Sequence, residues 1–343
     1  MSSSASQDLL TVGYFEIGRQ HGEGARQQIK GSIAFYAGLF ESTSRLKWDE
    51  VQQLADPFAA TIQKKWPPFY EEMQGVAEGS GSSVLDIVAL NIRTEIAFGQ
   101  FSDGCTSLAW HTSESSFLAQ NWDAKAQKEN LIVLKIQQDG KPDIQMITEA
   151  GIIGKIGFNE KGVGVCLNAI KAKGMDMNRL PVHLALRLAL ECSTASEALQ
   201  KLELFGVASP AHILVADRTT AFGVECSSTT MEKLVGDGRG RLIHTNHYKL
   251  QHNGVVDAQL LEDSEPRDTR MLELTDTLAK PTWNGIFQAF QDEADAPSSI
   301  CRTQVRKSTL ATLFNIIMDL RAGRAEICLG RPVDIEEKVL LSF

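Results

Sequence analysis

The spacing of apolar positions predicts a helical region in the first third of the chain. Apolar side chains recur every three or four residues over 29–40 and again over 51–62, which is the pattern of amphipathic helices. The prolines at 67–68 end this pattern, and a third helix is expected from there because proline is tolerated in a first helical turn. A further helix is predicted after Ser83, which has the spacing of a capping box with Asp86.

The rest of the chain alternates short apolar runs with helical stretches. The predicted strands are 131–136, 144–147, 155–158, 163–168, 213–216, 222–226, 242–245, 312–318 and 325–329. The predicted helices are 181–191, 196–204, 268–278 and 283–291. Strand blocks that alternate with helix pairs indicate two antiparallel sheets covered by helices, which is an α+β fold. We expect one domain over residues 1–343.

Two apolar segments at the start of the strand-rich region predict a hairpin. The first segment, Leu108 to Trp110, follows Cys105, and the second ends at Asp123. A polar, serine-containing turn over 112–116 joins them. Antiparallel pairing of the two segments would bring Asp123 back beside Cys105.

Cys105 is a candidate nucleophile without an adjoining base. A thiol must lose its proton before it attacks a carbonyl group, which takes a base or a positive environment. If the chain is cut after Gly104, the new α-amino group, with a pKa of about 7.7–8.0, can accept that proton. From Gly104 and Cys105 alone, however, a buried structural cysteine is the better interpretation, because cysteine is among the most buried residue types.

Composition and charge narrow the classes of function. A chain of 343 residues with 43% hydrophobic content can bury a large core. Its net charge of −9 argues against nucleic-acid binding and gives no overall attraction for an anionic thioester. The six cysteines are scattered without a Cys-x-x-Cys pair, so neither a disulfide framework nor a zinc knuckle is indicated.

The ends of the chain indicate where the protein resides. The first ten residues are polar and lack the basic and apolar regions of a secretory signal. No apolar run approaches the roughly 20 residues of a membrane span. The last three residues, Leu-Ser-Phe, differ from a Ser-Lys-Leu peroxisomal address. We therefore expect a cytoplasmic protein that does not bind a membrane.

Seven segments, in order along nearly the whole chain, carry a specific resemblance. They are 103–106 (Asp-Gly-Cys-Thr), 120–123 (Gln-Asn-Trp-Asp), 148–155 (Thr-Glu-Ala-Gly-Ile-Ile-Gly-Lys), 244–247 (His-Thr-Asn-His), 299–302 (Ser-Ile-Cys-Arg), 311–317 (Ala-Thr-Leu-Phe-Asn-Ile-Ile) and 329–332 (Leu-Gly-Arg-Pro). Together they resemble the fungal acyl-coenzyme A:isopenicillin N (6-aminopenicillanic acid) acyltransferase family, whose members are N-terminal-nucleophile (Ntn) hydrolases. The resemblance implies a four-layer αββα sandwich, with acyl-coenzyme A and a penicillin-type amine as substrates.

The resemblance also assigns roles to individual residues. It implies self-cleavage between Gly104 and Cys105, which would leave a heterodimer of a small chain (1–104) and a large chain (105–343). Cys105 would then be the nucleophile for acyl transfer, and Asp123 would help to hold the amine-bearing substrate. No metal or prosthetic group is required for this chemistry.

Asn246 lies between two histidines, His244 and His247. A zinc site is not predicted there, because no carboxylate or further histidine lies nearby in sequence. Taken alone, an asparagine at a strand end is usually a turn former. The resemblance instead implies that the Asn246 amide donates a hydrogen bond to the oxyanion of the tetrahedral intermediate.

One position departs from the family pattern and keeps other functions open. Family members read Lys-Ser-Arg-Gly-Ala-Thr where 307–312 of this chain read Lys-Ser-Thr-Leu-Ala-Thr. The arginine contacts the carboxylate of the penicillin nucleus, and Thr309 cannot replace its two-pronged contact. Arg302 and Arg306 are nearby cations that could compensate. The alternatives are a hydrolase of non-β-lactam amides and a catalytically inactive relative with a binding role.

Overall fold

Helices dominate the N-terminal part of the chain, as the sequence predicts. The computed structural model describes residues 7–8, 13–97, 104–125, 127–255, 261–296, 299–304 and 310–343. Six helices precede the hairpin: α1 (Tyr14–Gly24), α2 (Arg26–Ser44), α3 (Trp48–Lys65), α4 (Pro67–Ser80), α5 (Val84–Asn91) and α6 (Arg93–Ile96). The capping box is confirmed: the Asp86 amide donates to Ser83 Oγ at 3.1 Å, and the Ser83 amide donates to Asp86 Oδ2 at 2.9 Å.

The strands form two sheets. The first has the order β1-β4-β5-β6-β7-β8-β9-β10, and the second has the order β11-β2-β3-β12-β13-β14. Strands of the first sheet are β1 (Gln7–Asp8), β4 (Leu131–Ile136), β5 (Ile144–Glu149), β6 (Ile156–Asn159), β7 (Gly164–Ala169), β8 (Ala211–Ala216), β9 (Ala221–Cys226) and β10 (Met231–Val235). Strands of the second are β2 (Gly104–His111), β3 (Ser116–Lys125), β11 (Arg241–His244), β12 (Leu310–Asp319), β13 (Arg324–Arg331) and β14 (Asp334–Ser342). All pairings between these named strands are antiparallel except that between β1 and β4.

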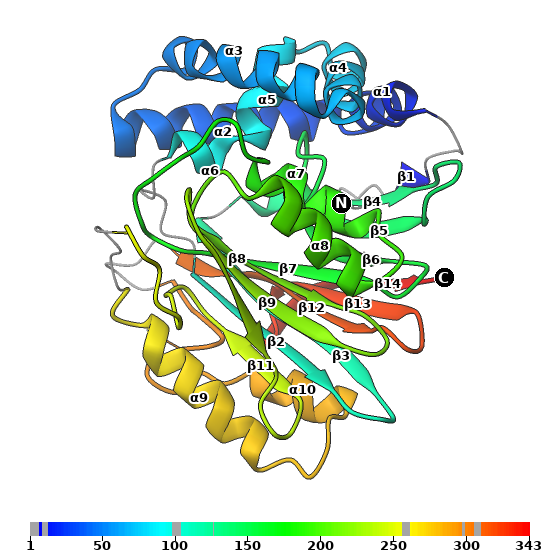
Figure 1. Cartoon of the computed structure of the whole chain (residues 1–343), viewed down its shortest axis with the longest axis vertical. Coiled ribbons are helices and arrows are strands. Elements are labelled where there is room, and N and C mark those ends of the chain that lie inside the picture. Colours follow the sequence, from blue (N-terminus) through cyan, green and yellow to red (C-terminus); the bar gives the residue numbers. More distant parts are fainter. Residues whose placement is uncertain are drawn as a thin grey trace.

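Helices cover the outer face of each sheet (Figure 1). The N-terminal helices, α7 (Val182–Leu190) and α8 (Ala195–Phe205) share one apolar cluster with the first sheet, whereas α9 (Ser264–Asp276) and α10 (Trp283–Phe290) share another with the second. A third cluster lies between the sheets. The predicted α+β architecture of two sheets between helical layers, αββα, is confirmed. The expectation of one domain stays a prediction.

Strand alternation determines which face of β2 each side chain occupies. Cys105 and Ala109 belong to the cluster between the sheets, whereas Leu108 and Trp110 pack with α9 and α10. The thiol of Cys105 therefore points into the space between the sheets.

The sequence prediction missed the helices α1 and α6, the short 3-10 helix over Lys128–Asn130, and the strands β1, β10 and β14. Helix α1 packs so closely on α4 that a Cβ on Gly18 would lie 1.9 Å from the Glu72 carbonyl oxygen. Strand β14 is an edge strand with a mostly exposed, charged sequence.

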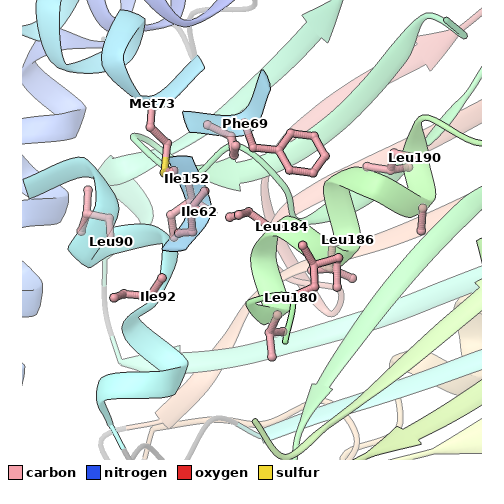
Figure 2. Packing of buried hydrophobic residues seen from close by; sticks show 14 of the residues in the cluster. Ile62, Phe69, Met73, Leu90, Ile92, Ile152, Leu180, Leu184, Leu186 and Leu190 are labelled. Atoms are coloured by element: carbon pink, nitrogen blue, oxygen red, sulfur yellow. The ribbon is translucent and has the colours of Figure 1, made fainter. Parts of the chain in front are cut away.

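The segment 148–155 connects β5 to β6 and packs against the N-terminal helices. Figure 2 shows Ile152 among the apolar side chains of these helices and of α7. The Gly151 amide donates to Nε2 of the buried His21 at 3.1 Å. Gly151 has a φ of 94°, a conformation that favours glycine. Burial lowers the pKa of His21 to about 3, and the charge of Arg187 adds to the shift.

His21 is expected to make stability depend on pH. The folded chain holds His21 neutral, while the unfolded chain binds a proton at an ordinary pKa of about 6.5, so stability falls as the pH drops below that value. The control is His21→Gln, whose amide oxygen can still accept from Gly151. Relative to this variant, the free energy of unfolding of the native chain should fall by about 1.4 kcal/mol between pH 7.5 and 5.5. Urea unfolding in a Cys105→Ala background measures this difference. A pH-independent difference would contradict the assignment.

Candidate functional site

The predicted hairpin places the start of β2 beside the end of β3. Gly104 pairs with Asp123, and Cys105 pairs with Trp122. Cys105 is 1% exposed. The predicted hairpin is confirmed, but Asp123 lies opposite Gly104 rather than opposite Cys105. Because neighbouring residues of a strand point to opposite faces, Trp122 lies on the face of the thiol and Asp123 on the face of α9.

Asn246 contacts the backbone of Cys105 through its side-chain amide. Its Oδ1 accepts a hydrogen bond from the Cys105 amide at 2.8 Å, and its Nδ2 donates to the Ala169 carbonyl at 2.8 Å. In the uncleaved chain the oxygen of the Asn246 amide therefore faces the nitrogen that would become the α-amino group. Nδ2 carries a second hydrogen, which is the donor an oxyanion would need.

Arg267 on α9 completes this contact and was missed by the sequence analysis. Its Nη1 donates to the Cys105 carbonyl at 2.6 Å and to Thr106 Oγ1 at 3.1 Å, while its Nη2 donates to Asn246 Oδ1 at 2.8 Å. Burial lowers the pKa of the Arg267 guanidinium, and the Asp123 carboxylate opposes that shift. Two donors on Asn246 Oδ1 determine which way its amide points.

Asp123 belongs to a buried polar cluster at the 104/105 junction. Its Oδ1 accepts from Thr312 Oγ1 at 2.6 Å, and its Oδ2 lies 3.4 Å from Arg302 Nε. Arg302 also forms an ion pair with Asp263. A Cβ on Gly104 would lie 3.0 Å from Asp123 Oδ2 and 3.3 Å from Arg302 Cζ, so a side chain there would press on the ion pair.

This cluster limits what Arg302 can do for a substrate. Two carboxylates, Asp123 and Asp263, already contact its guanidinium. The idea that Arg302 replaces the missing family arginine would require one of these ion pairs to open. Thr309 and Arg306 lie outside the described residues, as does Asp103.

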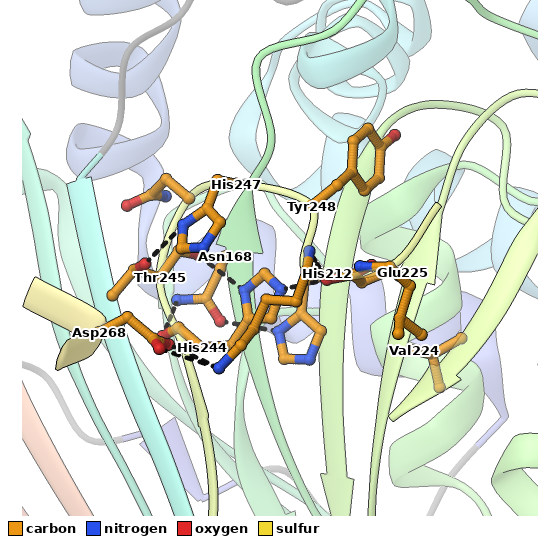
Figure 3. A network of polar contacts seen from close by, with 12 residues as sticks. Asn168, His212, Val224, Glu225, His244, Thr245, His247, Tyr248 and Asp268 are labelled. Atoms are coloured by element: carbon orange, nitrogen blue, oxygen red, sulfur yellow. Dashed lines mark hydrogen bonds and ion pairs between the residues drawn. The ribbon is translucent and has the colours of Figure 1, made fainter. Parts of the chain in front are cut away.

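A network of buried polar groups supports the loop that carries Asn246 (Figure 3). The Glu225 carboxylate accepts backbone hydrogen bonds from Lys249 at 2.6 Å and Leu250 at 3.0 Å, and it contacts His244 Nε2 at 2.8 Å. Burial alone would raise the pKa of Glu225, but the interactions with His244 and the backbone hydrogen bonds from Lys249 and Leu250 together outweigh it, and the pKa is lowered. The His212 ring stacks on His244 with a centroid distance of 3.5 Å.

Ser264 ties the same loop to α9. The backbone amide of Asn246 donates to Ser264 Oγ at 2.7 Å, and Nδ1 of His247 lies 2.8 Å from the same oxygen. His244 thus contacts Glu225, and His247 contacts Ser264. Within the described part of the chain, no three His, Cys, Asp or Glu side chains form a group that could hold a metal ion.

Comparison with known proteins identifies the family of this chain. A family model described as acyl-coenzyme A:6-aminopenicillanic acid acyl-transferase matches residues 110–334. The acyl-coenzyme A:6-aminopenicillanic-acid-acyltransferase 40 kDa form of Emericella nidulans is 41% identical over 334 residues, covering 96% of this chain and 93% of that protein. The chain belongs to the acyl-coenzyme A:6-aminopenicillanic acid acyltransferase family. The matched region of the family model starts after Cys105, so it does not include the candidate nucleophile.

A solved structure shares the fold of this acyltransferase family member. A variant of conjugated bile acid hydrolase from Clostridium perfringens superposes with a TM-score of 0.51 at 14% identity, covering 69% of this chain and 92% of that chain. Penicillin V acylase from Agrobacterium tumefaciens gives a TM-score of 0.49 at 11% identity, covering 70% and 86%. The first likeness supports the Ntn-hydrolase fold expected from the sequence.

Arg267→Lys should slow the expected cleavage at residues 104/105. One ammonium group cannot contact both the Cys105 carbonyl and Asn246 Oδ1 as the guanidinium does. Loss of one charged hydrogen bond corresponds to a rate lower by roughly tenfold to a hundredfold. The rate at which newly translated chain is cleaved measures the effect.

Arg270→Lys is the matched control on the same helix. Its guanidinium binds Asp292 and Glu273 near the surface, where ion pairs contribute little. This variant should be cleaved at the native rate. Equal rates for the two variants would show that Arg267 does not act on Cys105.

Proposed function

We propose that this protein is a self-cleaving Ntn acyltransferase that uses Cys105 as its nucleophile. The observation that carries the proposal is the 2.8 Å hydrogen bond from the Cys105 amide to Asn246 Oδ1. It places a side chain of the predicted site on the nitrogen that cleavage would release. Membership of the acyltransferase family supports the reaction class.

The first reaction in this proposal is cleavage of the chain. Cys105 Sγ attacks the Gly104 carbonyl carbon, the bond from that carbon to the Cys105 nitrogen breaks, and the nitrogen takes the thiol proton. Water then hydrolyses the resulting thioester and leaves a carboxylate on Gly104. During this step Asn246 holds the backbone amide of Cys105, and Arg267 holds its carbonyl.

The second reaction transfers an acyl group. The free α-amino group of Cys105 takes the thiol proton, and Sγ attacks the thioester carbonyl of acyl-coenzyme A. Coenzyme A leaves with a proton, and an acyl-enzyme thioester remains. An amine on a penicillin nucleus, or water, attacks this thioester and regenerates the thiol. In this proposal Asn246 Nδ2, which donates one hydrogen to the Ala169 carbonyl, uses its second hydrogen to stabilise the oxyanion, and Asp123 holds the amine-bearing substrate.

Other parts of the proposal come from sequence alone. The cleaved chains stay together as a heterodimer, the substrates are small molecules, and nucleic acid is not a partner. A cytoplasmic location is also a prediction. Among the described residues, no helix has the length and apolar character needed to cross a bilayer.

Hydrolysis of non-β-lactam amides is the second candidate function. Thr309 favours it, because the arginine that binds the penicillin carboxylate in the family is absent. A family member without activity that acts as a binding partner is less well supported, since Cys105 and Asn246 are both present and in contact.

The first test of the proposal concerns Cys105. Native protein should separate under denaturing conditions into two chains, while Cys105→Ala should remain one chain of 37.6 kDa, because the attacking sulfur is gone. Denaturing electrophoresis with intact mass distinguishes these results. Cleavage of Cys105→Ala at the same bond would mean that an external protease acts, and the nucleophile assignment would fail.

The second test concerns the acceptor. Thr309→Arg should lower the KM for 6-aminopenicillanic acid by roughly tenfold to a hundredfold with little change in kcat, because a carboxylate contact of equal strength in ground and transition states changes binding alone. Thr309→Met, which extends the side chain without charge, is the control. Initial rates across acceptor concentrations measure both parameters. An unchanged KM in the arginine variant would show that another group already holds the carboxylate.

A further inference from the structure

The segment 148–155 has no role in the proposed chemistry, yet it contacts the expected small chain at several points. The side chain of Asn91 on α5 donates to the Gly151 carbonyl at 2.8 Å and accepts from the Ile153 amide at 2.9 Å. On its other side, the Gly151 amide donates to His21 on α1. The backbone of this segment of the expected large chain is therefore hydrogen-bonded to side chains on helices of the expected small chain.

Glu149, at the start of this segment, links buried charges from both expected chains. Its carboxylate accepts from Arg93 Nη2 at 3.1 Å and also contacts Tyr36 and Lys155. Arg93 and Tyr36 precede residue 105, whereas Glu149 and Lys155 follow it. Burial would raise the pKa of Glu149, but Arg93 and Lys155 outweigh it and hold the pKa well below its ordinary value. The carboxylate is therefore ionised between two cations.

Lys155 extends this cluster toward the nucleophile. Its Nζ lies 3.6 Å from the centroid of the Trp122 ring, which is a close cation–π contact. Trp122 is the cross-strand partner of Cys105, and both side chains belong to the cluster between the sheets. Directly opposite side chains on one face of a sheet lie next to each other. The indole is thus one wall of the space around the thiol, and Lys155 holds it.

We propose that residues 148–155 are a connector through which Arg93 of the small chain positions Trp122 beside Cys105. The proposal rests on the proposed cleavage at 104/105, and it makes the small chain a working part of the mature enzyme. Arg93 holds Glu149, Glu149 holds Lys155, and Lys155 holds the indole. Arg93 and Lys155 are positioning residues in this arrangement.

The cluster also gives a charge that an experiment can detect. Arg93 and Lys155 are two cations against the one carboxylate of Glu149, which leaves one positive charge. His183 contacts Arg93, and burial keeps its pKa well below the ordinary value, so it adds no charge at neutral pH. Glu95 also lies close to Arg93, and burial raises the pKa of its carboxyl. An excess positive charge favours the thiolate of Cys105.

Other titratable groups also lie around the thiol and the backbone of Cys105, and they stay unchanged in the variants below. They come from β3, α9, β7 and the loops before α9 and β12: Asp123, Arg267, Cys166, Asp263 and Arg302. Any change in the titration of Cys105 can therefore be attributed to the substituted residue.

The test compares four variants of the full chain after cleavage. Arg93→Met and Lys155→Met each remove one positive charge, Arg93→Lys keeps it, and Glu72→Gln is the control. Glu72 on α4 pairs with Arg187 on α7 at 2.9 Å, so it also joins the two expected chains, but it is not in contact with Lys155 or Trp122 in any described interaction. Iodoacetamide is the probe, and alkylation of Cys105 is read by mass spectrometry across pH, with chain association followed by size-exclusion chromatography.

Both methionine variants should move the midpoint of Cys105 alkylation to higher pH and lower acyl-coenzyme A turnover by roughly twofold to thirtyfold, while the chains stay associated. Arg93→Lys should restore most of the midpoint, and Glu72→Gln should leave it unchanged. If Arg93→Met does not fold, the alkylation midpoint of Lys155→Met tests the proposal. A native midpoint in the methionine variants, or an equal shift in Glu72→Gln, would overturn the connector. Absence of cleavage in the native chain would instead contradict the proposed function.

Discussion

The rest of the site depends on the two hydrogen bonds that hold the backbone amide and carbonyl of Cys105. Asn246 accepts from its amide, and Arg267 donates to its carbonyl while also donating to Asn246. Each of these groups is buried, so loss of any one would leave a polar partner unsatisfied. The arrangement therefore requires α9, the loop after β11 and the start of β2 to be in place together.

Strand alternation divides the surroundings of Cys105 into two chemically different halves. The face toward α9 carries Asp123, Arg267 and Arg302. Because Gly104 has no side chain, this cluster can approach the backbone closely. The face between the sheets carries the thiol itself and the indole of Trp122. Side chains at every second position of a strand lie on the same face. A shift of the strand register by one residue would therefore exchange the two halves.

The sequence predicted the parts of this structure that depend on local patterns. The helix start at Ser83, the end of α3 before Pro67 and the hairpin of β2 and β3 all follow from turn and capping signals. Helix α1 escaped prediction because its glycines weaken the helical pattern, and only the close contact with α4 explains them. Strand β14 is mostly exposed, carries four charged side chains and lacks a clear apolar alternation.

Arg267 could not be identified from the sequence, because it contacts Cys105 from 162 residues away and resembles any arginine of a surface helix.

N-terminal sequencing of the purified protein, with intact mass, tests the central claim most directly. The account predicts two chains, one of which begins at Cys105 and the other of which ends at Gly104. A single uncleaved chain in active protein, or a new N-terminus at any other residue, would contradict it.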